Sequence, residues 1–177
     1  MKSDKFDAIV RSFKYHAGKE GKIMLDKFIK IFDGTIDDDL ARKIFVTFDQ
    51  DQDGAIELRE YMRLMGISHW GSVDQKLRAT FQVFNKNKND VLSREEFQQM
   101  YVSMVKQKRA AIHFKETGRR FSANSEVLTQ DELDAINEKI MPLFKKIDVD
   151  KSDTIDYDEF VNGYLKYPDE CAFFKQF

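Results

Sequence analysis

The segment Phe48-Asp49-Gln50-Asp51-Gln52-Asp53-Gly54-Ala55-Ile56-Glu57-Leu58-Arg59-Glu60-Tyr61 decides the fold. Counted from Asp49, aspartates stand at positions one, three and five, and a glutamate closes the twelfth position. A looped chain with this spacing turns its acidic side chains toward one point, and a hard dication prefers six to eight oxygen ligands. Gly54 at position six suits a turn with positive φ, where a β-carbon would clash. The segment therefore predicts a calcium-binding loop between two helices.

This spacing is that of an EF-hand loop, in which each ligand has a fixed place. The expected ligands are Asp49, Asp51, Asp53, the backbone carbonyl of Ala55, Glu57 (directly or through water) and Glu60, which would supply two oxygens. An acidic surface turn is the alternative. Five carboxylates in register between two phenylalanine-containing helical patterns favour the EF-hand.

Three further segments repeat the register of this loop. Position eight is apolar in every copy and would pair neighbouring loops in a short two-stranded sheet: Ile23, Ile56, Leu92 and Ile155. We predict an all-α fold of four EF-hands in two paired lobes, 1–68 and 69–177, with short β pairings between loops. The gap before the fourth loop is the longest and predicts a helical insertion at 105–128.

The four loops differ in their chemistry. The first, 16–27, has lost its acids and carries Lys27 at position twelve, so we interpret this hand as structural; His16 alone is weak evidence for another metal. The third loop keeps oxygen ligands but only one formal charge, so it should bind calcium weakly or not at all: Asn85, Asn87, Asn89, Val91, Ser93 and Glu96.

The fourth loop carries a competent ligand set: Asp148, Asp150, Ser152, the carbonyl of Thr154, Asp156 and Glu159. Asp90 and Asp153 stand at position six of the third and fourth loops, where glycine is usual, and aspartate tolerates positive φ better than most residues. We expect two Ca²⁺ ions per chain, in the second and fourth loops, and Mg²⁺ is possible there at resting calcium.

Composition limits the classes of function. The net charge of −2 does not favour a nucleic-acid partner, and the single cysteine, Cys171, fits a reducing, cytoplasmic location. The chain starts Met-Lys, so myristoylation, which requires glycine at position two, is not expected to bring it to membranes. We find no nucleophile–base pair, zinc cluster or phosphate-binding glycine loop, and therefore expect a protein that is not an enzyme. We also expect it to be a monomer or a weak dimer.

Local signals outside the loops lead to four further expectations. Gly66 and Gly71 should end the exit helix of the second hand at the lobe boundary, and Pro142 should kink or split the helix that enters the fourth loop. The basic stretch 105–121 either covers part of the protein's own surface or is a solvated helix extension. The phenylalanine-rich tail 167–177 should pack into the groove of the third and fourth hands until a target helix displaces it.

The stretches Leu40-Ala41-Arg42-Lys43-Ile44-Phe45-Val46-Thr47-Phe48-Asp49 and Gly71-Ser72-Val73-Asp74-Gln75-Lys76-Leu77-Arg78-Ala79-Thr80-Phe81 resemble the neuronal calcium sensor family, the recoverin- and frequenin-like proteins. The resemblance implies two compact EF-hand lobes, an inactive first hand and a calcium-exposed groove that captures a target protein helix. This chain departs from the family at Ala17-Gly18, where the family has Cys-Pro. Calcineurin-B-type regulatory subunits share the Asp74-Gln75-Lys76-Leu77-Arg78 pattern and remain an alternative.

The resemblance leaves three functions to compare. A calcium sensor would open a hydrophobic groove when calcium binds, whereas a cytosolic calcium buffer resembling sarcoplasmic proteins would not. A calcium-triggered photoprotein would enclose its chromophore with several Trp and His residues, and this chain has one Trp and three His. Methionines on the exit helices suit an adaptable groove and favour the sensor: Met62, Met65, Met100 and Met104.

Overall fold

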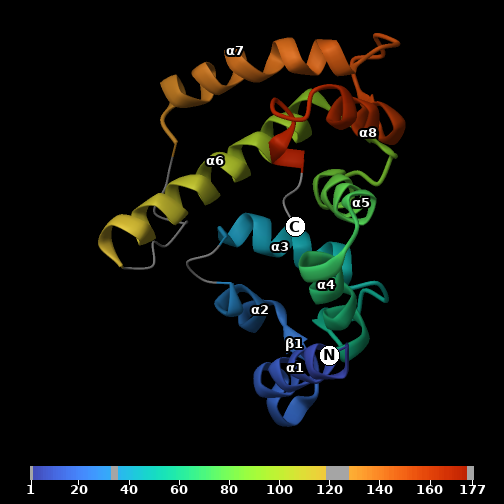
Figure 1. Cartoon of the computed structure of the whole chain (residues 1–177), viewed down its shortest axis with the longest axis vertical. Coiled ribbons are helices and arrows are strands. Elements are labelled where there is room, and N and C mark those ends of the chain that lie inside the picture. The colour runs from blue at the N-terminus through green and yellow to red at the C-terminus, as the bar shows by residue number, and fades with distance from the viewer. Residues whose placement is uncertain (1, 33–35, 119–127, 175–177) are drawn as a thin grey trace.

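The structure is a computed structural model that describes residues 2–32, 36–118 and 128–174 (Figure 1). Within these ranges the α-helices are α1 (Lys2–Ala17), α2 (Leu25–Ile31), α3 (Asp38–Phe48), α4 (Leu58–Trp70), α5 (Val73–Phe84), α6 (Arg94–Thr117), α7 (Gln130–Ile147) and α8 (Tyr157–Lys166). In the same ranges, 3₁₀ turns lie at η1 (Gly18–Glu20) and η3 (Ala172–Phe174), and the strands are β1 (Ile23–Met24), β2 (Ala55–Ile56), β3 (Val91–Leu92) and β4 (Ile155–Asp156). The predicted all-α fold with small β pairings is confirmed.

The strands pair the loops two by two, in the register that the sequence predicts. β1 runs antiparallel to β2 with Ile23 opposite Ile56, and β3 runs antiparallel to β4 with Leu92 opposite Ile155. All four position-eight side chains are completely buried. Each two-residue sheet therefore ties two loops together and also contributes to the core.

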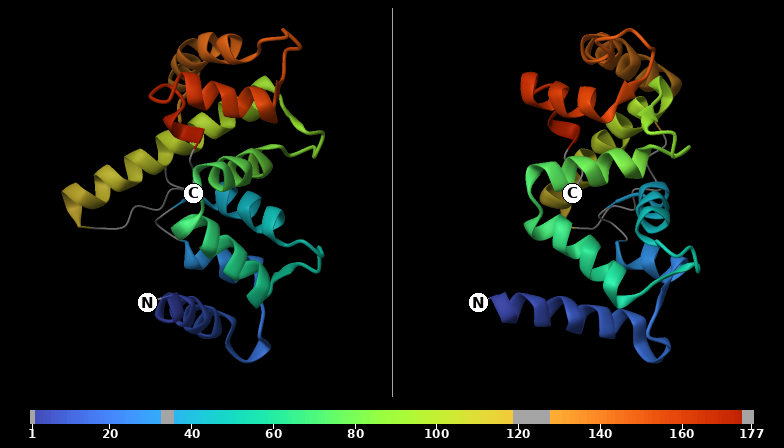
Figure 2. Two further views of the ribbon diagram at one scale, coloured as in Figure 1. Left: turned by 45° about the vertical axis from the view of Figure 1, so that its right-hand side comes forward. Right: turned by 90° about the vertical axis from the view of Figure 1, so that its right-hand side faces the viewer.

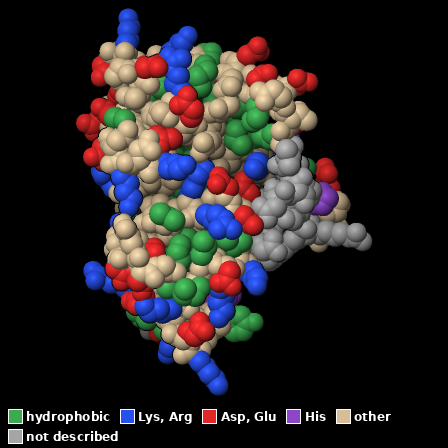
Figure 3. Space-filling view, turned by 180° about the vertical axis from the view of Figure 1, so that it is seen from behind, with side chains coloured by type: hydrophobic (Ala, Val, Ile, Leu, Met, Phe, Trp, Pro, Cys, Tyr) green, Lys and Arg blue, Asp and Glu red, His purple; other side chains and the backbone are tan. Residues whose placement is uncertain are grey.

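The hands lie along the long axis of the molecule. Helices α1 and α2 lie at one end, α7 and α8 lie at the other, and α3 to α5 lie between (Figures 1 and 2). Edge-to-face phenylalanine pairs join neighbouring helices. The ring centroids of Phe28 of α2 and Phe45 of α3 are 5.4 Å apart, as are those of Phe97 of α6 and Phe144 of α7. On the face shown in Figure 3, acidic and basic side chains are interspersed, so this face has no continuous basic surface.

The junction between α4 and α5 differs from the prediction at one glycine. Helix α4 continues through Gly66 to Trp70, because one glycine inside a packed helix costs too little to end it. Gly71 ends the helix, and a β-carbon there would lie 2.5 Å from the carbonyl oxygen of Ile67. Ser72 and Gln75 then form a capping box that starts α5.

Helix α7 is not split at Pro142, although splitting was one of the predicted outcomes. The helix runs unbroken from Gln130 to Ile147, and its predicted capping box between Thr129 and Glu132 is present. Proline removes one backbone hydrogen bond. Burial of an apolar stripe along the same helix compensates for that loss: Ile136, Ile140, Leu143, Phe144 and Ile147.

The first part of the predicted insertion extends α6, the exit helix of the third hand. Lys106 Nζ lies 3.1 Å from Asp37 Oδ2 at the start of α3, and Arg109 pairs with Glu132 of α7 at 2.7 Å. Farther along, Ile112 and Phe114 are about half exposed. The basic stretch therefore contacts the protein's own surface and then projects away from it (Figure 2), while its residues Arg119, Arg120 and Phe121 lie outside the described ranges.

The tail lies where the sequence predicts, against the third and fourth hands. Cys171, Phe173 and Phe174 are buried. The Phe174 ring stacks on Phe160 with a centroid separation of 4.0 Å and an interplanar angle of 5°, and Phe173 meets Tyr101 edge-on at 5.0 Å. The remaining tail phenylalanine, Phe177, lies outside the described residues. No described helix has the length and apolar character to span a membrane.

We predict that Phe144→Ala lowers the free energy of unfolding in calcium-free buffer by about 3–5 kcal/mol, because Phe144 is completely buried and a cavity would replace its ring. The matched control, Phe114→Ala, removes the same ring from a half-exposed site and should change stability by less than about 0.5 kcal/mol. Urea unfolding followed by circular dichroism measures both. Equal effects of the two substitutions would contradict this core assignment.

Candidate metal centres

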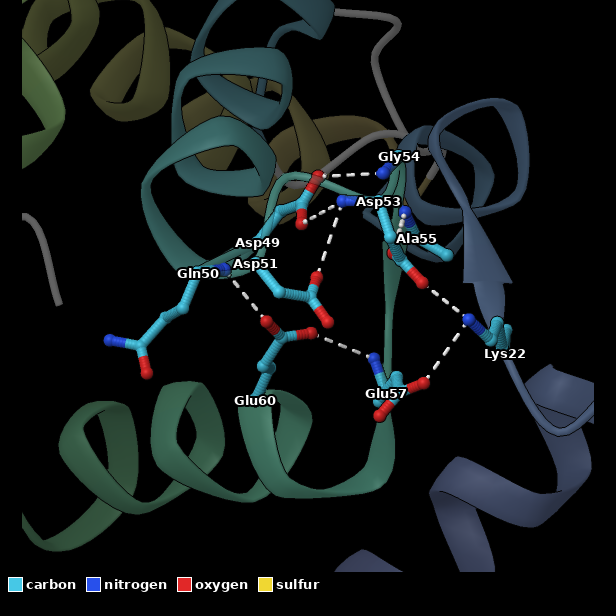
Figure 4. A network of polar contacts seen from close by, with 9 residues as sticks. All are labelled: Lys22, Asp49, Gln50, Asp51, Asp53, Gly54, Ala55, Glu57 and Glu60. Atoms are coloured by element: carbon cyan, nitrogen blue, oxygen red, sulfur yellow. Dashed lines mark hydrogen bonds and ion pairs between the residues drawn. The ribbon is translucent and has the colours of Figure 1, made fainter.

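The second loop brings its first three acids together. Asp49, Asp51 and Asp53 each offer a carboxylate oxygen, and these oxygens lie within 4.8 Å of one another (Figure 4). The loop's own backbone orients them: the Asp53 amide donates to Asp49 Oδ1 and to Asp51 Oδ1 at 3.2 Å, and the Gly54 amide donates to Asp49 Oδ2 at 3.0 Å. The carboxylates are therefore held in position by the loop itself.

Glu60 closes this loop and also starts helix α4. Its Oε1 accepts from the amide of Gln50 at 2.7 Å, and its Oε2 accepts from the amide of Glu57 at 2.9 Å. Glu57 is the N-cap residue and Glu60 the third residue of α4, so positions nine and twelve form a capping box. Any movement of the Glu60 carboxylate is thus coupled directly to the first turn of the exit helix.

The fourth loop repeats this arrangement with one hydroxyl. Oxygens of Asp148, Asp150 and Glu159 lie within 4.8 Å of one another. Glu159 accepts from the amides of Val149 at 2.8 Å and Asp156 at 3.1 Å, as Glu60 does in the second loop. Hydrogen bonds from the Ser152 side chain and amide lower the pKa of Asp150 and favour its charged form.

Asp156, at position nine of the fourth loop, caps α8. Its Oδ1 accepts from the amide of Glu159 at 2.8 Å. Like Glu57 in the second loop, it lies outside the cluster of three acidic oxygens. Ala55 and Thr154, the position-seven residues, contribute backbone carbonyls as the sequence predicts, and the Thr154 hydroxyl lies 2.9 Å from that of Ser152.

The third loop keeps the backbone frame without the charge. Glu96 accepts from the amides of Lys86 at 2.8 Å and Ser93 at 2.9 Å, and Asn85 Oδ1 accepts from the amide of Asn89 at 3.3 Å. The closing glutamate therefore makes the same two contacts as in the other two loops. What differs is the ligand charge, since Glu96 is the single acid among its six expected ligand positions.

Two positions adopt positive φ in the second, third and fourth loops alike. Position six does so as expected, at Gly54 (81°), Asp90 (62°) and Asp153 (65°). Position four also does so, at Gln52 (57°), Lys88 (51°) and Lys151 (59°). Sequence reasoning missed position four because glutamine and lysine carry no preference for this conformation.

The first loop departs from the other three in both backbone and charge. Helix α1 continues to Ala17, the second loop position, whereas α3, α5 and α7 end one residue before their loops. Lys27 Nζ lies 3.8 Å from where a β-carbon on Gly18 would stand, so an ammonium group lies beside the third loop position. These features fit a hand that supplies a strand and no metal site.

Lys22 of this first hand is the functional candidate that sequence reasoning missed. Its Nζ contacts Asp53 Oδ2 and lies 3.1 Å from Glu57 Oε1, both in the second loop (Figure 4). The hydrogen bond from Lys22 lowers the pKa of Asp53 and raises the pKa of Lys22. The antiparallel strand register could have revealed it, because Lys22 comes one residue before Ile23.

The donor sets of the second and fourth loops fit a hard dication. All expected ligands are oxygens: in the second loop Asp49, Asp51, Asp53, Ala55, Glu57 and Glu60, and in the fourth Asp148, Asp150, Ser152, Thr154, Asp156 and Glu159. Sulfur and imidazole, which softer metals prefer, are absent from both sets. Calcium is therefore the ion that these residues would hold best.

Comparison with known proteins identifies the repeat. The EF-hand domain pair family matches residues 37–102 and 74–165. Guanylyl cyclase-activating protein 2 of Gallus gallus is 25% identical over 149 residues, covering 82% of this chain and 69% of that protein. Visinin of Gallus gallus is 28% identical over 91 residues, covering 49% of this chain and 47% of visinin. The resemblance to neuronal calcium sensors is confirmed, at low identity.

A further relative covers only part of this chain. Calaxin of Homo sapiens is 32% identical over 75 residues, or 42% of this chain. The matched segment spans 36% of calaxin's own length. This similarity therefore concerns a part of calaxin rather than the whole protein.

We predict opposite effects of the same substitution at two glycines, measured by urea unfolding without calcium. Gly54→Ala should lower the free energy of unfolding by about 1–2 kcal/mol, because φ is 81° and a β-carbon disfavours that conformation. Gly66→Ala, in the interior of α4, should raise it by about 0.5–1 kcal/mol, because alanine is the better helix former. Neither new methyl group meets an atom within 4 Å, so only the backbone differs. A stabilising Gly54→Ala would contradict the loop geometry.

Proposed function

This chain belongs to the EF-hand domain pair family, and we propose that it is a calcium sensor that binds a helix of a target protein. Its relationship to neuronal calcium sensors supports this reading. The second and fourth loops would each take one Ca²⁺, with dissociation constants of roughly 10⁻⁷–10⁻⁵ M, and Mg²⁺ is a possible occupant at resting calcium. The third loop would stay weak because of its low charge.

A signal from the loops would reach the helices through Glu60 and Glu159. Bound calcium supplies two positive charges that neutralise the clustered carboxylates. Both glutamates hold the amide of the loop's second residue and, at the same time, the first turn of an exit helix, α4 or α8. A shift of either carboxylate would therefore tilt its exit helix, which is how sensor hands expose apolar surface.

The packed tail is the observation that carries this proposal. Residues 171–174 place two aromatic rings against α5, α6 and α8, in contact with Phe97, Tyr101 and Phe160. The face between the third and fourth hands thus accepts a short helical segment with phenylalanine anchors. A target helix with aromatic anchors could compete for the same face.

A second opening, lined by apolar and polar side chains, lies near the second hand. A cavity of about 400 Å³ is lined by Phe48 of α3, by Met62, Ile67 and Trp70 of α4, and by Ala79 of α5, among others. Met62 is the one candidate methionine of the four that lines it, since Met100 is completely buried and Met65 and Met104 pack against the core. Calcium-driven movement of α4 would change the width of this cavity.

The proposal predicts two calcium ions per chain in calorimetric titrations. Glu60→Gln and Glu159→Gln should each abolish one site, because each removes the charge of a twelfth-position ligand. Glu96→Gln is the matched control and should leave both tight sites intact. Three or more equivalent sites, or tight binding that survives the two substitutions together, would overturn the assignment.

The proposal also predicts that calcium loosens the tail, and Cys171 reports on this. Burial raises the pKa of the Cys171 thiol to about 12, so alkylation at pH 8 should run about a thousandfold slower than in urea, where the thiol is ordinary. With calcium, we expect the alkylation rate of the folded chain to rise at least about tenfold. Mass spectrometry with iodoacetamide measures the rate.

Two variants complete this measurement. Glu159→Gln should remove the calcium response, and Cys171→Ser should remove the label. Truncation after Asp169 should leave a folded chain that binds a hydrophobic dye more strongly. If calcium leaves the alkylation rate unchanged or slows it, the protein is better described as a calcium buffer, and an unfolded truncation would show that the tail is a permanent core element.

A further inference from the structure

The ammonium group of Lys22 bridges two acids of the neighbouring loop. Lys22 belongs to the degenerate first hand, at its seventh loop position. Its Nζ contacts Asp53 Oδ2 and Glu57 Oε1, at the fifth and ninth positions of the second loop (Figure 4). In the described part of the chain, no other Lys, Arg or His forms an ion pair with the five acids of the second loop.

The strand pairing places Lys22 there. Ile23 lies opposite Ile56, and Met24 lies opposite Ala55. One step along the same antiparallel register, Lys22 faces Glu57, and opposite charges in that cross-strand position attract. The β1–β2 pairing therefore keeps Lys22 beside the second loop whenever the two hands are paired.

The lysine contacts a carboxylate oxygen of an expected calcium ligand. Asp53 Oδ1 accepts from the amide of Ala55 at 2.9 Å, and Asp53 Oδ2 contacts Lys22, so both oxygens of this expected ligand are engaged. For Asp53 to coordinate an ion through Oδ2, Lys22 must withdraw. From these contacts we infer that Lys22 sets the calcium affinity of the second loop by competing with the ion for Asp53.

The three side chains are partly exposed, which suits a contact that a calcium ion can displace. The side chains of Lys22, Asp53 and Glu57 are 43%, 29% and 48% exposed. Exposed ion pairs are weak, so the lysine stabilises the crowded acids without calcium and yields to a dication. On withdrawal from Asp53 it can keep its contact with Glu57, whose expected ligation at position nine can run through water.

The fourth loop provides an internal comparison. Arg94 of the third hand pairs with Asp153, at position six, which is not an expected ligand position. Among the described residues, no Lys or Arg pairs with the clustered acids Asp148, Asp150 and Glu159. Competition by a lysine is therefore specific to the second loop.

The test compares full-length wild type, Lys22→Gln and Lys19→Gln in calcium titrations followed by NMR at the Gly54 and Asp153 amides. These amides donate to Asp49 and Asp148 and report separately on the second and fourth loops. Lys22→Gln should lower the dissociation constant of the second loop about three- to tenfold and change that of the fourth by less than about twofold. The gain should shrink as salt rises.

Lys19→Gln removes the same charge from the same hand, where Lys19 forms no ion pair in the described residues, and should change neither site by more than about twofold. The inference is overturned if Lys22→Gln leaves the second loop unchanged or weaker, or if Lys19→Gln has the same effect. It rests on calcium binding by the second loop. A titration of the wild type alone tests that binding. If the wild-type Gly54 amide does not respond to calcium, the proposed calcium site in the second loop is wrong, independently of any effect of Lys22.

Discussion

The pairing of neighbouring loops through position eight is the constraint on which the rest of the structure depends. Ile23 and Ile56, and Leu92 and Ile155, join the loops by two-residue strands and are completely buried in the core. A two-stranded ribbon is too small to be stable alone, so each loop needs both its partner strand and the helices packed beneath it. This explains why the first hand keeps its frame after losing its ligands: without β1, the second loop would have an unpaired strand.

In the loops, the same residues hold the backbone and offer the ligands. Glu60, Glu96 and Glu159 each accept from one amide early in the loop and one at the start of the exit helix. Asparagine in the third loop leaves these two glutamate contacts in place, and its single amide oxygen still accepts one loop amide, as Asn85 Oδ1 does from Asn89. The backbone structure of a loop and its calcium affinity are therefore separable. Substitution of the early acids changes the ligand charge, whereas substitution of the closing glutamate changes both the ligand charge and the backbone hydrogen bonds.

Features that depend on residue type at fixed spacing could be predicted from the sequence, and features that depend on two distant side chains could not. The position-eight residues predicted the strands, and the Thr129–Glu132 spacing predicted the start of α7. The contact of Lys22 with Asp53, 31 residues away in the sequence, was missed because finding it requires the register of the paired strands and not one loop alone. The predicted alternative that Pro142 splits α7 was wrong because burial of an apolar stripe outweighs one lost hydrogen bond, a balance that local propensity does not contain. The division into lobes 1–68 and 69–177 stays a prediction.

The close approach at Gly71 has a mechanical consequence. Only Gly71 and Ser72 separate α4 from α5, and the Gly71 backbone lies so near the Ile67 carbonyl that a side chain would not fit. Such a short, tightly packed connection is rigid, because neither helix can rotate without moving the other. Helix α4 follows the second loop and α5 leads into the third. A rotation of α4 that begins at the second loop would therefore also rotate α5 and shift the third loop.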